Sequence, residues 1–315
     1  MTSVPDGYSF ALCLTHDVDR PYKSLYHVLY HGLQDRSFDH LRQFVGGENP
    51  YWQFEEIMAL EDELGVRSSF YFLNEAHLLQ ECGPETWLRS DAWVQHLFRY
   101  DVRQPEIAEV IRQLDAGGWE VGLHGSYHTF RDLDRIADEK RVLEDVLGRP
   151  VRGGRQHYLR LQVPETWRYH AEVGLKYDAS LGSTVDYGFQ HGYDVVRPFD
   201  DEFVVFPLTA METALPDPGK SFDAAWDACL HLLAEAAENG AVMTILWHPR
   251  FFNEREFPGY RRLYRRLIEA ALEANAWVGP PAQLYDELAL GESNRGRTLE
   301  IEAPEERPVD PRVDA

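Results

Sequence analysis

The chain has 315 residues, of which 44% are hydrophobic and 13% aromatic, and it can therefore build a full globular core. Its formal net charge of −22 excludes a nucleic-acid partner and an anionic membrane surface as expected partners, because both would repel it. No run of about 18 apolar residues predicts a membrane span. Residues 1–7 lack the basic and apolar regions of a secretory signal, so we expect a cytoplasmic protein.

Acidic residues outnumber basic residues, and lysine is scarce. Asp and Glu number 53 against 31 Lys and Arg, and the lysines are only Lys23, Lys140, Lys176 and Lys220. Such an acidic, lysine-poor surface predicts an organism with a high-salt cytoplasm, as in halophilic archaea, where screening weakens self-repulsion. The cysteines are odd in number and widely spaced, which predicts free thiols at Cys13, Cys82 and Cys229.

Apolar runs and amphipathic stretches alternate along the chain. In the first part we predict a strand at 10–15, an insertion at 21–50, a helix at 55–64 that ends at Gly65, a strand at 68–73, an insertion at 77–100 and a helix from Pro105. The later part predicts a strand at 120–123, a helix at 133–147, a strand at 204–206, a helix at 222–239, a strand at 242–247, and helices at 260–274 and 281–288.

This alternation favours an α/β protein with a parallel sheet, either open or closed into a barrel. We predict one domain over residues 1–290, because barrels of this length need not divide. Residues 291–315 are acidic and contain proline without an apolar period, which predicts a disordered tail. In such folds the functional groups gather at the carboxyl ends of the strands.

Two pairs of polar residues follow predicted strands. Asp17 and Asp19 are two residues apart, so in an extended chain both carboxylates point the same way. His124 and His128 are four residues apart, the spacing that places two imidazoles on one side of a helical turn. One carboxylate and two imidazoles supply three ligands and leave a position for water, a pattern typical of catalytic zinc sites. The other carboxylate is then available as a base.

Two further segments carry polar groups. Residues 152–158 are basic and rich in glycine, and either cradle a phosphate through backbone amides or place a guanidinium beside Asp17 to hold it ionised. His248 follows the strand predicted at 242–247. It is either a packed or capping histidine, or a general acid, because imidazole titrates near neutral pH.

These four segments, in this order, resemble the motifs of polysaccharide deacetylases of the NodB-homology type, also called carbohydrate esterase family 4. The family motifs are TFDDG, H-[ST]-x-x-H, R-x-P-Y and a late L-x-H, and residues 15–19 resemble an Asp-x-Asp variant of the first. The resemblance implies a distorted (β/α) barrel of about seven parallel strands. It also implies the following roles: Asp17 as base, Asp19, His124 and His128 as metal ligands, Arg155 as the group that orients the base, His248 as acid, and the Tyr158 N–H in an oxyanion hole.

The sequence departs from the family pattern in three places. Gly125 stands where the family has Ser or Thr, and Gln156 and His157 replace the residues around the proline of the third motif. The fourth motif, which would tune the pKa of His248, has no clear match, and its candidates are Asp178, or Asp186 together with Tyr187.

Aromatic residues near the motifs could form a wall against a sugar ring or an acyl methyl group. The expected substrate-binding residues are Trp247 beside His248, together with Tyr127 and Tyr158, and Tyr71 is a further candidate. Packing is the simpler role for aromatic side chains at strand ends.

The resemblance implies a hydrolase that removes an N-acetyl group from an amino sugar or glycan, with a divalent metal, Zn²⁺ first and Co²⁺, Ni²⁺ or Mn²⁺ as alternatives. An allantoinase-like hydrolase of a non-sugar amide or cyclic ureide is a second reading. A non-catalytic glycan-binding protein is a third, and a phosphate-binding protein is a fourth. The two insertions shape either the cleft or an oligomer contact.

Overall fold

The computed structural model describes residues 3–23, 49–75, 99–199 and 202–288, together with 79, 83, 86–88, 93 and 96. Most of the two predicted insertions and the whole predicted tail at 291–315 lie outside these residues, as does Cys82. The domain boundaries therefore stay predictions. Cys13 and Cys229 are buried free thiols, as expected.

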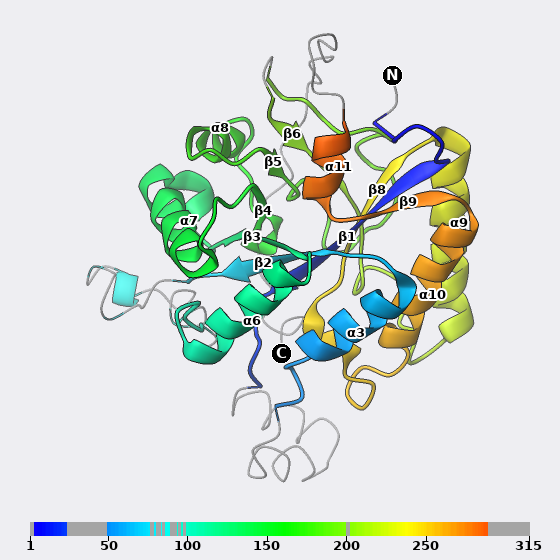
Figure 1. Ribbon diagram of the computed structural model, residues 1–315, viewed down its shortest axis with the longest axis horizontal. Helices are drawn as coiled ribbons and strands as arrows, with labels where there is room; N and C mark the ends of the chain where they lie inside the picture. The colour runs from blue at the N-terminus through cyan, green and yellow to red at the C-terminus, as the bar shows by residue number, and fades with distance from the viewer. Residues whose placement is uncertain are drawn as a thin grey trace.

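The described residues form a nine-stranded sheet in which all paired strands are parallel. The strand order is β6-β5-β4-β3-β2-β1-β8-β7, and β9 also pairs with β1. The sheet curls into a distorted (β/α) barrel, which confirms the predicted fold class (Figure 1). The strands are β1 (Phe10–Val18), β2 (Ser69–Leu73), β3 (Glu120–Gly125), β4 (Gly153–Gln156), β5 (Tyr177–Asp178), β6 (Val204–Val205), β7 (Leu208–Met211), β8 (Val242–Leu246) and β9 (Ala276–Gly279).

Helices surround the sheet, and their apolar faces pack on its outer side (Figure 1). They are α3 (Phe54–Leu64), α6 (Pro105–Ala116), α7 (Leu133–Leu147), α8 (Glu165–Glu172), α9 (Phe222–Asn239), α10 (Tyr260–Glu273) and α11 (Pro281–Glu287). Short 3₁₀ segments are η1 (Thr86–Leu88), η2 (Thr129–Arg131), η3 (His157–Leu159) and η4 (Pro249–Phe252). Among the described residues, no helix has the length and apolar character needed to cross a bilayer.

The helix boundaries follow from local chemistry. The Asp132 side chain accepts a hydrogen bond from the Arg135 N–H at the start of α7, as an N-cap residue does. Gly65 ends α3 at φ 69°, a left-handed conformation that glycine adopts without steric cost. The predicted bounds of α7 and α9 agree with the structure.

Strand β1 lies at the centre of the sheet and has two different faces. Phe10, Leu12 and Leu14 pack in the core beneath the helices, whereas Ala11 and Cys13 pack inside the barrel. This alternation continues to the carboxyl end of the strand. It carries Asp17 into the barrel mouth and His16 toward the helices.

Four strands differ from the sequence predictions. The structure adds β4, β5, β7 and β9, each of two to four residues. Residues 153–156, expected within a glycine-rich loop, form strand β4 between β3 and β5. Strand pairing there uses backbone groups that a phosphate cradle would need.

Candidate active site

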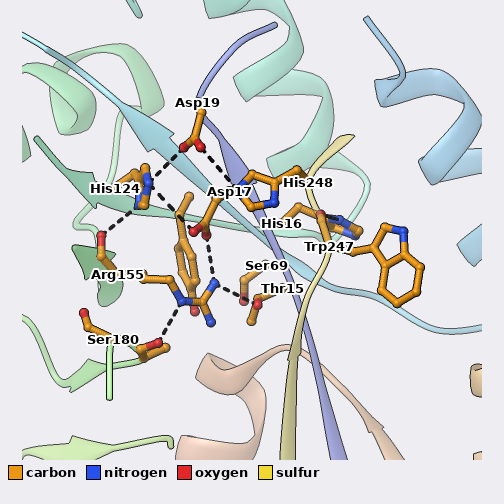
Figure 2. A network of polar contacts seen from close by, with 12 residues as sticks. Thr15, His16, Asp17, Asp19, Ser69, His124, Arg155, Ser180, Trp247 and His248 are labelled. Carbon is orange, nitrogen blue, oxygen red and sulfur yellow. Dashed lines mark hydrogen bonds and ion pairs between the residues drawn. The ribbon is translucent and has the colours of Figure 1, made fainter. Parts of the chain in front are cut away.

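The predicted polar residues meet at the carboxyl ends of neighbouring strands (Figure 2). Asp17 lies in β1, His124 lies in β3, and Arg155 lies in β4. His124 and Arg155 are register partners in the parallel pairing of β3 with β4. His248 follows β8, which pairs with β1 up to Thr15. Strand register therefore brings together residues that are far apart in the sequence.

Asp17 is held by Arg155. The Arg155 Nη1 donates to Asp17 Oδ1 at 2.8 Å and to Thr15 Oγ1 at 2.9 Å, and its Nε donates to the Ala179 carbonyl at 2.7 Å. Both charged residues are buried, with exposed fractions of 3% and 1%. The guanidinium also lies over the Tyr71 ring, 5.1 Å from its centroid. These contacts fix the direction of the Asp17 carboxylate, as the sequence predicts.

Asp19 and His124 face each other across the mouth of the barrel. Their Oδ1 and Nε2 atoms are 2.9 Å apart, but they are not aligned for a hydrogen bond. Within the described part of the chain, both atoms are buried without a hydrogen-bond partner. The His124 Nδ1–H donates to the Arg155 carbonyl at 2.9 Å, which leaves the Nε2 lone pair free for a metal.

Imidazoles surround the Asp19 carboxylate. Burial alone would raise the pKa of Asp19, but His157, His124 and His248 outweigh it and hold the pKa well below its usual value. Burial lowers the pKa of His124, yet Asp17 and Asp19 raise it above its ordinary value. The carboxylates thus favour positive charge at this point, and a divalent cation would supply it.

Three residues can share one metal ion. The ligand atoms of Asp19, His124 and His157 all lie within 4.8 Å of one another. The orphaned Asp19 Oδ1 and His124 Nε2, together with this carboxylate and imidazole donor set, fit a divalent metal such as Zn²⁺. The sequence analysis treated His157 only as a departure from the third motif. His157 directly follows β4, and its position at the carboxyl end of a strand is the feature that could have indicated a role in the site.

His128 lies outside this group. The prediction that His124 and His128 share one helical turn is wrong, because His124 is inside strand β3 and His128 lies in the turn after it. His128 directly precedes η2, and its ring packs edge-on against the Tyr127 ring at 4.8 Å between centroids.

His248 contacts two carboxylates. Its Nδ1–H donates to Glu212 Oε1 at 2.7 Å, and its Nε2 lies 3.2 Å from Asp19 Oδ2. Burial lowers the pKa of His248, but Glu212 and Asp19 outweigh this effect and raise it to about 10. Both carboxylates therefore favour the protonated imidazole, the form that a general acid needs.

Glu212 is a site residue that the sequence analysis missed. It follows β7 and is fully buried, and its Oε2 also accepts from the His248 backbone N–H at 3.3 Å. Asp178, the first candidate for this position, instead accepts hydrogen bonds from Trp167, at 3.1 Å, and from Ser180. Asp186 is exposed and accepts from Ser183, so neither candidate contacts His248 in the structure.

Two departures from the family pattern explain each other. A side chain added at Gly125 would place its Cβ 2.4 Å from the Gln156 Nε2, so a Ser or Thr there would clash. The Gln156 amide is itself held, with Nε2 2.8 Å from His170 Nε2 and Oε1 accepting from Thr129 Oγ1 at 3.0 Å. The missing hydroxyl is therefore the consequence of a glutamine packed beneath the loop.

Ser126 and Tyr127 in that loop are anchored by buried carboxylates. The Ser126 N–H donates to Glu139 Oε2 at 3.0 Å, and the Tyr127 N–H donates to Glu75 Oε2 at 3.2 Å. Burial raises the pKa of Glu139 to about 7, although Arg135 opposes the shift. These contacts fix the chain directly after His124.

The predicted substrate wall is only partly present. Trp247 is 1% exposed and packs on Tyr264 at 5.3 Å between centroids, and Figure 2 shows its indole directed away from Asp17. The prediction that Trp247 contacts substrate is therefore wrong, because the side chain belongs to the core. Tyr127 is 9% exposed and packs edge-on against half-buried Tyr158 at 5.4 Å.

Tyr158 has an unusual backbone. Its φ of 57° lies in the left-handed region, which a tyrosine rarely adopts. Such local strain is characteristic of functional loops, where surrounding packing enforces it. The turn carries the backbone N–H that the sequence analysis assigned to an oxyanion hole.

A small pocket adjoins these groups. It is lined by Asp17, Val18, Asp19, Arg20, Pro21, His248, Pro249 and Arg250. Asp17 and His248 therefore share one opening with Asp19, a carboxylate that could bind a metal. Two arginines stand at the same opening.

Comparison with known proteins identifies similar folds. No protein-family model and no curated protein matches the sequence. Two solved structures assigned as polysaccharide deacetylases are similar. The one from Mycobacterium smegmatis has a TM-score of 0.60 and 19% identity, over 96% of this chain and 99% of that chain. The one from Pseudomonas aeruginosa PAO1 has a TM-score of 0.54 and 14% identity, over 90% of this chain and 92% of that chain. The allantoinase Puue is also similar, with a TM-score of 0.57 and 16% identity over 92% of this chain and 94% of that chain. At these identities the likeness shows a shared fold.

Proposed function

We propose that this protein is a metal-dependent hydrolase that removes an N-acetyl or other N-acyl group from an amino sugar or glycan. One observation carries the proposal: the pair of Asp17 and Arg155, the group of Asp19, His124 and His157, and the pair of His248 and Glu212 lie together, with Asp17, Asp19 and His248 lining one small pocket. A base, a set of metal ligands and an acid are the groups that amide hydrolysis needs. The similar folds of deacetylases and an allantoinase support a hydrolase.

The proposed metal ligands are Asp19, His124 and His157. A divalent metal held there would lower the pKa of water and polarise the amide carbonyl. Asp17 accepts the proton of the attacking water, and its contact with Arg155 keeps the carboxylate correctly directed. The other Asp17 oxygen, Oδ2, lies 3.8 Å from His124 Nε2, beside the proposed metal ligands.

His248 protonates the departing amine. Nitrogen is a poor leaving group unless it receives a proton as the carbon–nitrogen bond breaks. Glu212 holds the Nδ1 proton, which directs Nε2 toward Asp19 and the cleft. The Tyr158 N–H is the proposed donor to the carbonyl oxygen, and removing such a donor typically lowers the rate by about 10²–10³.

The first test combines metal content with product release. We expect the purified protein to contain about one equivalent of zinc or a similar divalent ion, and to release acetate from N-acetylglucosamine-containing substrates. A chelator should stop the release, and added metal should restore it. Bound metal without acetate release from sugars, but with opening of a cyclic ureide, would favour the allantoinase-like alternative. Acetate release that survives full removal of the metal would contradict the proposal.

The ligand assignment predicts different effects for two histidines. We expect His157→Ala to weaken metal binding about 10-fold to 100-fold, because His157 belongs to the group of close ligand atoms. His128→Ala tests the ligand role that the family resemblance implies, and we expect it to retain metal. Metal content after dialysis against a graded chelator measures both. Loss of metal in His128→Ala with retention in His157→Ala would reverse the assignment.

We also propose that the protein works in a high-salt cytoplasm. The net charge of −22 and the scarcity of lysine support this proposal. The assays above therefore belong in high-salt buffer, where screening reduces repulsion between the acidic side chains.

A further inference from the structure

Arg250 is a cation at the edge of an acidic cleft. It belongs to η4, two residues after His248, and lines the opening together with Asp17 and Asp19. Its guanidinium centre lies 5.2 Å from the centroid of the Phe251 ring, which supports one side of the group. The guanidinium is thus positioned beside the proposed acid rather than on a distant surface.

The guanidinium of Arg250 lacks the partners that other arginines of the site have. Its Nε is buried without a hydrogen-bond partner, and no ion pair joins Arg250 to any residue that the structure describes. Arg155, by contrast, donates to Asp17, Thr15 and the Ala179 carbonyl. The Nε is enclosed by protein, so a ligand would meet the Nη1 and Nη2 donors, for which no hydrogen bond to a described residue is found.

The carboxylates near the cleft already have other partners. Asp17 pairs with Arg155, Asp19 lies against His124 and His248, and Glu256 pairs with Lys23. Among the described residues, no ion pair joins any of these three carboxylates to Arg250.

Arg20 lines the same opening as Arg250. Burial and Glu256 raise the pKa of the Tyr51 hydroxyl, whereas Arg250 and Arg20 lower it, so both cations act on one point beside the cleft. Two arginines therefore lie at an opening that also carries Asp17 and Asp19.

We propose that Arg250 binds an anionic group on the amine half of the substrate, so that the hydrolysed amide belongs to a molecule that also carries a carboxylate or a phosphate. This inference rests on the proposed function. A guanidinium matches both anions with paired hydrogen bonds, whereas a neutral sugar needs no cation. The amine half is favoured because Arg250 adjoins His248, which protonates the departing nitrogen.

Three probes test the proposal: N-acetylglucosamine, which is neutral, N-acetylmuramic acid, which adds a carboxylate, and N-acetylglucosamine 6-phosphate. Binding of each probe is measured by calorimetry with the metal-loaded Asp17→Asn variant, in which turnover does not interfere. The kcat/KM for each probe is measured with the protein that retains Asp17. We expect one of the anionic probes to be preferred about 10-fold to 100-fold. Arg250→Gln should remove the preference and Arg250→Lys should retain part of it. The probe that is preferred identifies the anion as carboxylate or phosphate.

The matched control is Arg112→Gln, an exposed arginine on α6 that pairs with Glu109. It should leave the preference unchanged, and thermal unfolding verifies that each variant is folded. Equal binding of all three probes, or an anion preference that survives in Arg250→Gln, would overturn the inference. An Arg250-dependent preference without hydrolysis of any probe would support the anion site and contradict the proposed deacetylation.

Discussion

Asp17→Asn is expected to lower kcat by about 10²–10⁴ while the metal stays bound. Asparagine has nearly the same shape as aspartate, and its oxygen can still accept from Arg155 Nη1, but it cannot take a proton from water. Asp17 also lies outside the group of close metal ligands formed by Asp19, His124 and His157. Steady-state kinetics and metal analysis of the same preparation measure the two effects separately.

Two controls accompany this variant. Asp138→Asn changes an exposed aspartate that pairs with Arg141 on α7, and it should leave the rate unchanged. Asp19→Asn should lose metal and activity together. Because Asp17→Asn leaves the buried Arg155 without its ionic partner, thermal unfolding is needed to verify the fold. A wild-type rate in Asp17→Asn would exclude Asp17 as the base.

Glu212→Gln is expected to reduce the rate by about 10² at alkaline pH and to shift the pH profile. Burial opposes the charge on His248, and Glu212 with Asp19 overcomes this effect and raises the pKa to about 10. In the wild-type protein the protonated imidazole is present at lower pH and is lost as pH rises through that value. Glutamine removes one of the two negative charges, so the acid form should be lost at lower pH.

The measurement is kcat/KM as a function of pH for the two proteins. The alkaline limb of the profile should move to lower pH in Glu212→Gln, which a merely structural role of Glu212 would not produce. Glu144→Gln is a suitable control, because Glu144 pairs with Lys140 on α7, away from the cleft. An unchanged alkaline limb would show that Glu212 does not tune the acid.

The helices and long strands could be predicted because their signals are local. The apolar period along α7 and α9, and the capping residues at their ends, are visible in the sequence itself. The long apolar run of β8 is equally clear. Strand β4 was hidden, because two of its four residues are glycines and the other two are polar, so pairing with neighbours decides its conformation.

The site was predictable only where residues are close in sequence or follow a recognisable strand. Asp17, Asp19, His124 and His248 met that condition, and Arg155 was found through the family resemblance. Glu212 belongs to the site because β7 pairs with β8, a contact between segments that no local pattern relates.

His157 and Trp247 show that sequence alone does not predict which way a side chain at a strand end points. His157 was not predicted to face Asp19, and Trp247 was predicted to face the substrate. His157 turns toward Asp19 because the chain bends directly after β4, and Trp247 turns into the core because Tyr260 and Tyr264 provide an aromatic pocket. Which way a side chain faces at a strand end depends on what packs there.

Strand β1 has a further consequence for how the activity responds to damage. Strand β8 pairs with residues 11–15 of β1 on one edge. On the other edge, β9 pairs with residues 10–13 and β2 pairs with residues 15–18. Asp17 pairs with Tyr71 of β2, so among the described strands it stays in place as long as β1 and β2 remain paired at the centre of the sheet. Because Asp17 lies on this strand, partial melting at the periphery would leave the base in place. Heat inactivation that acts through displacement of Asp17 would then coincide with cooperative loss of the whole fold rather than precede it.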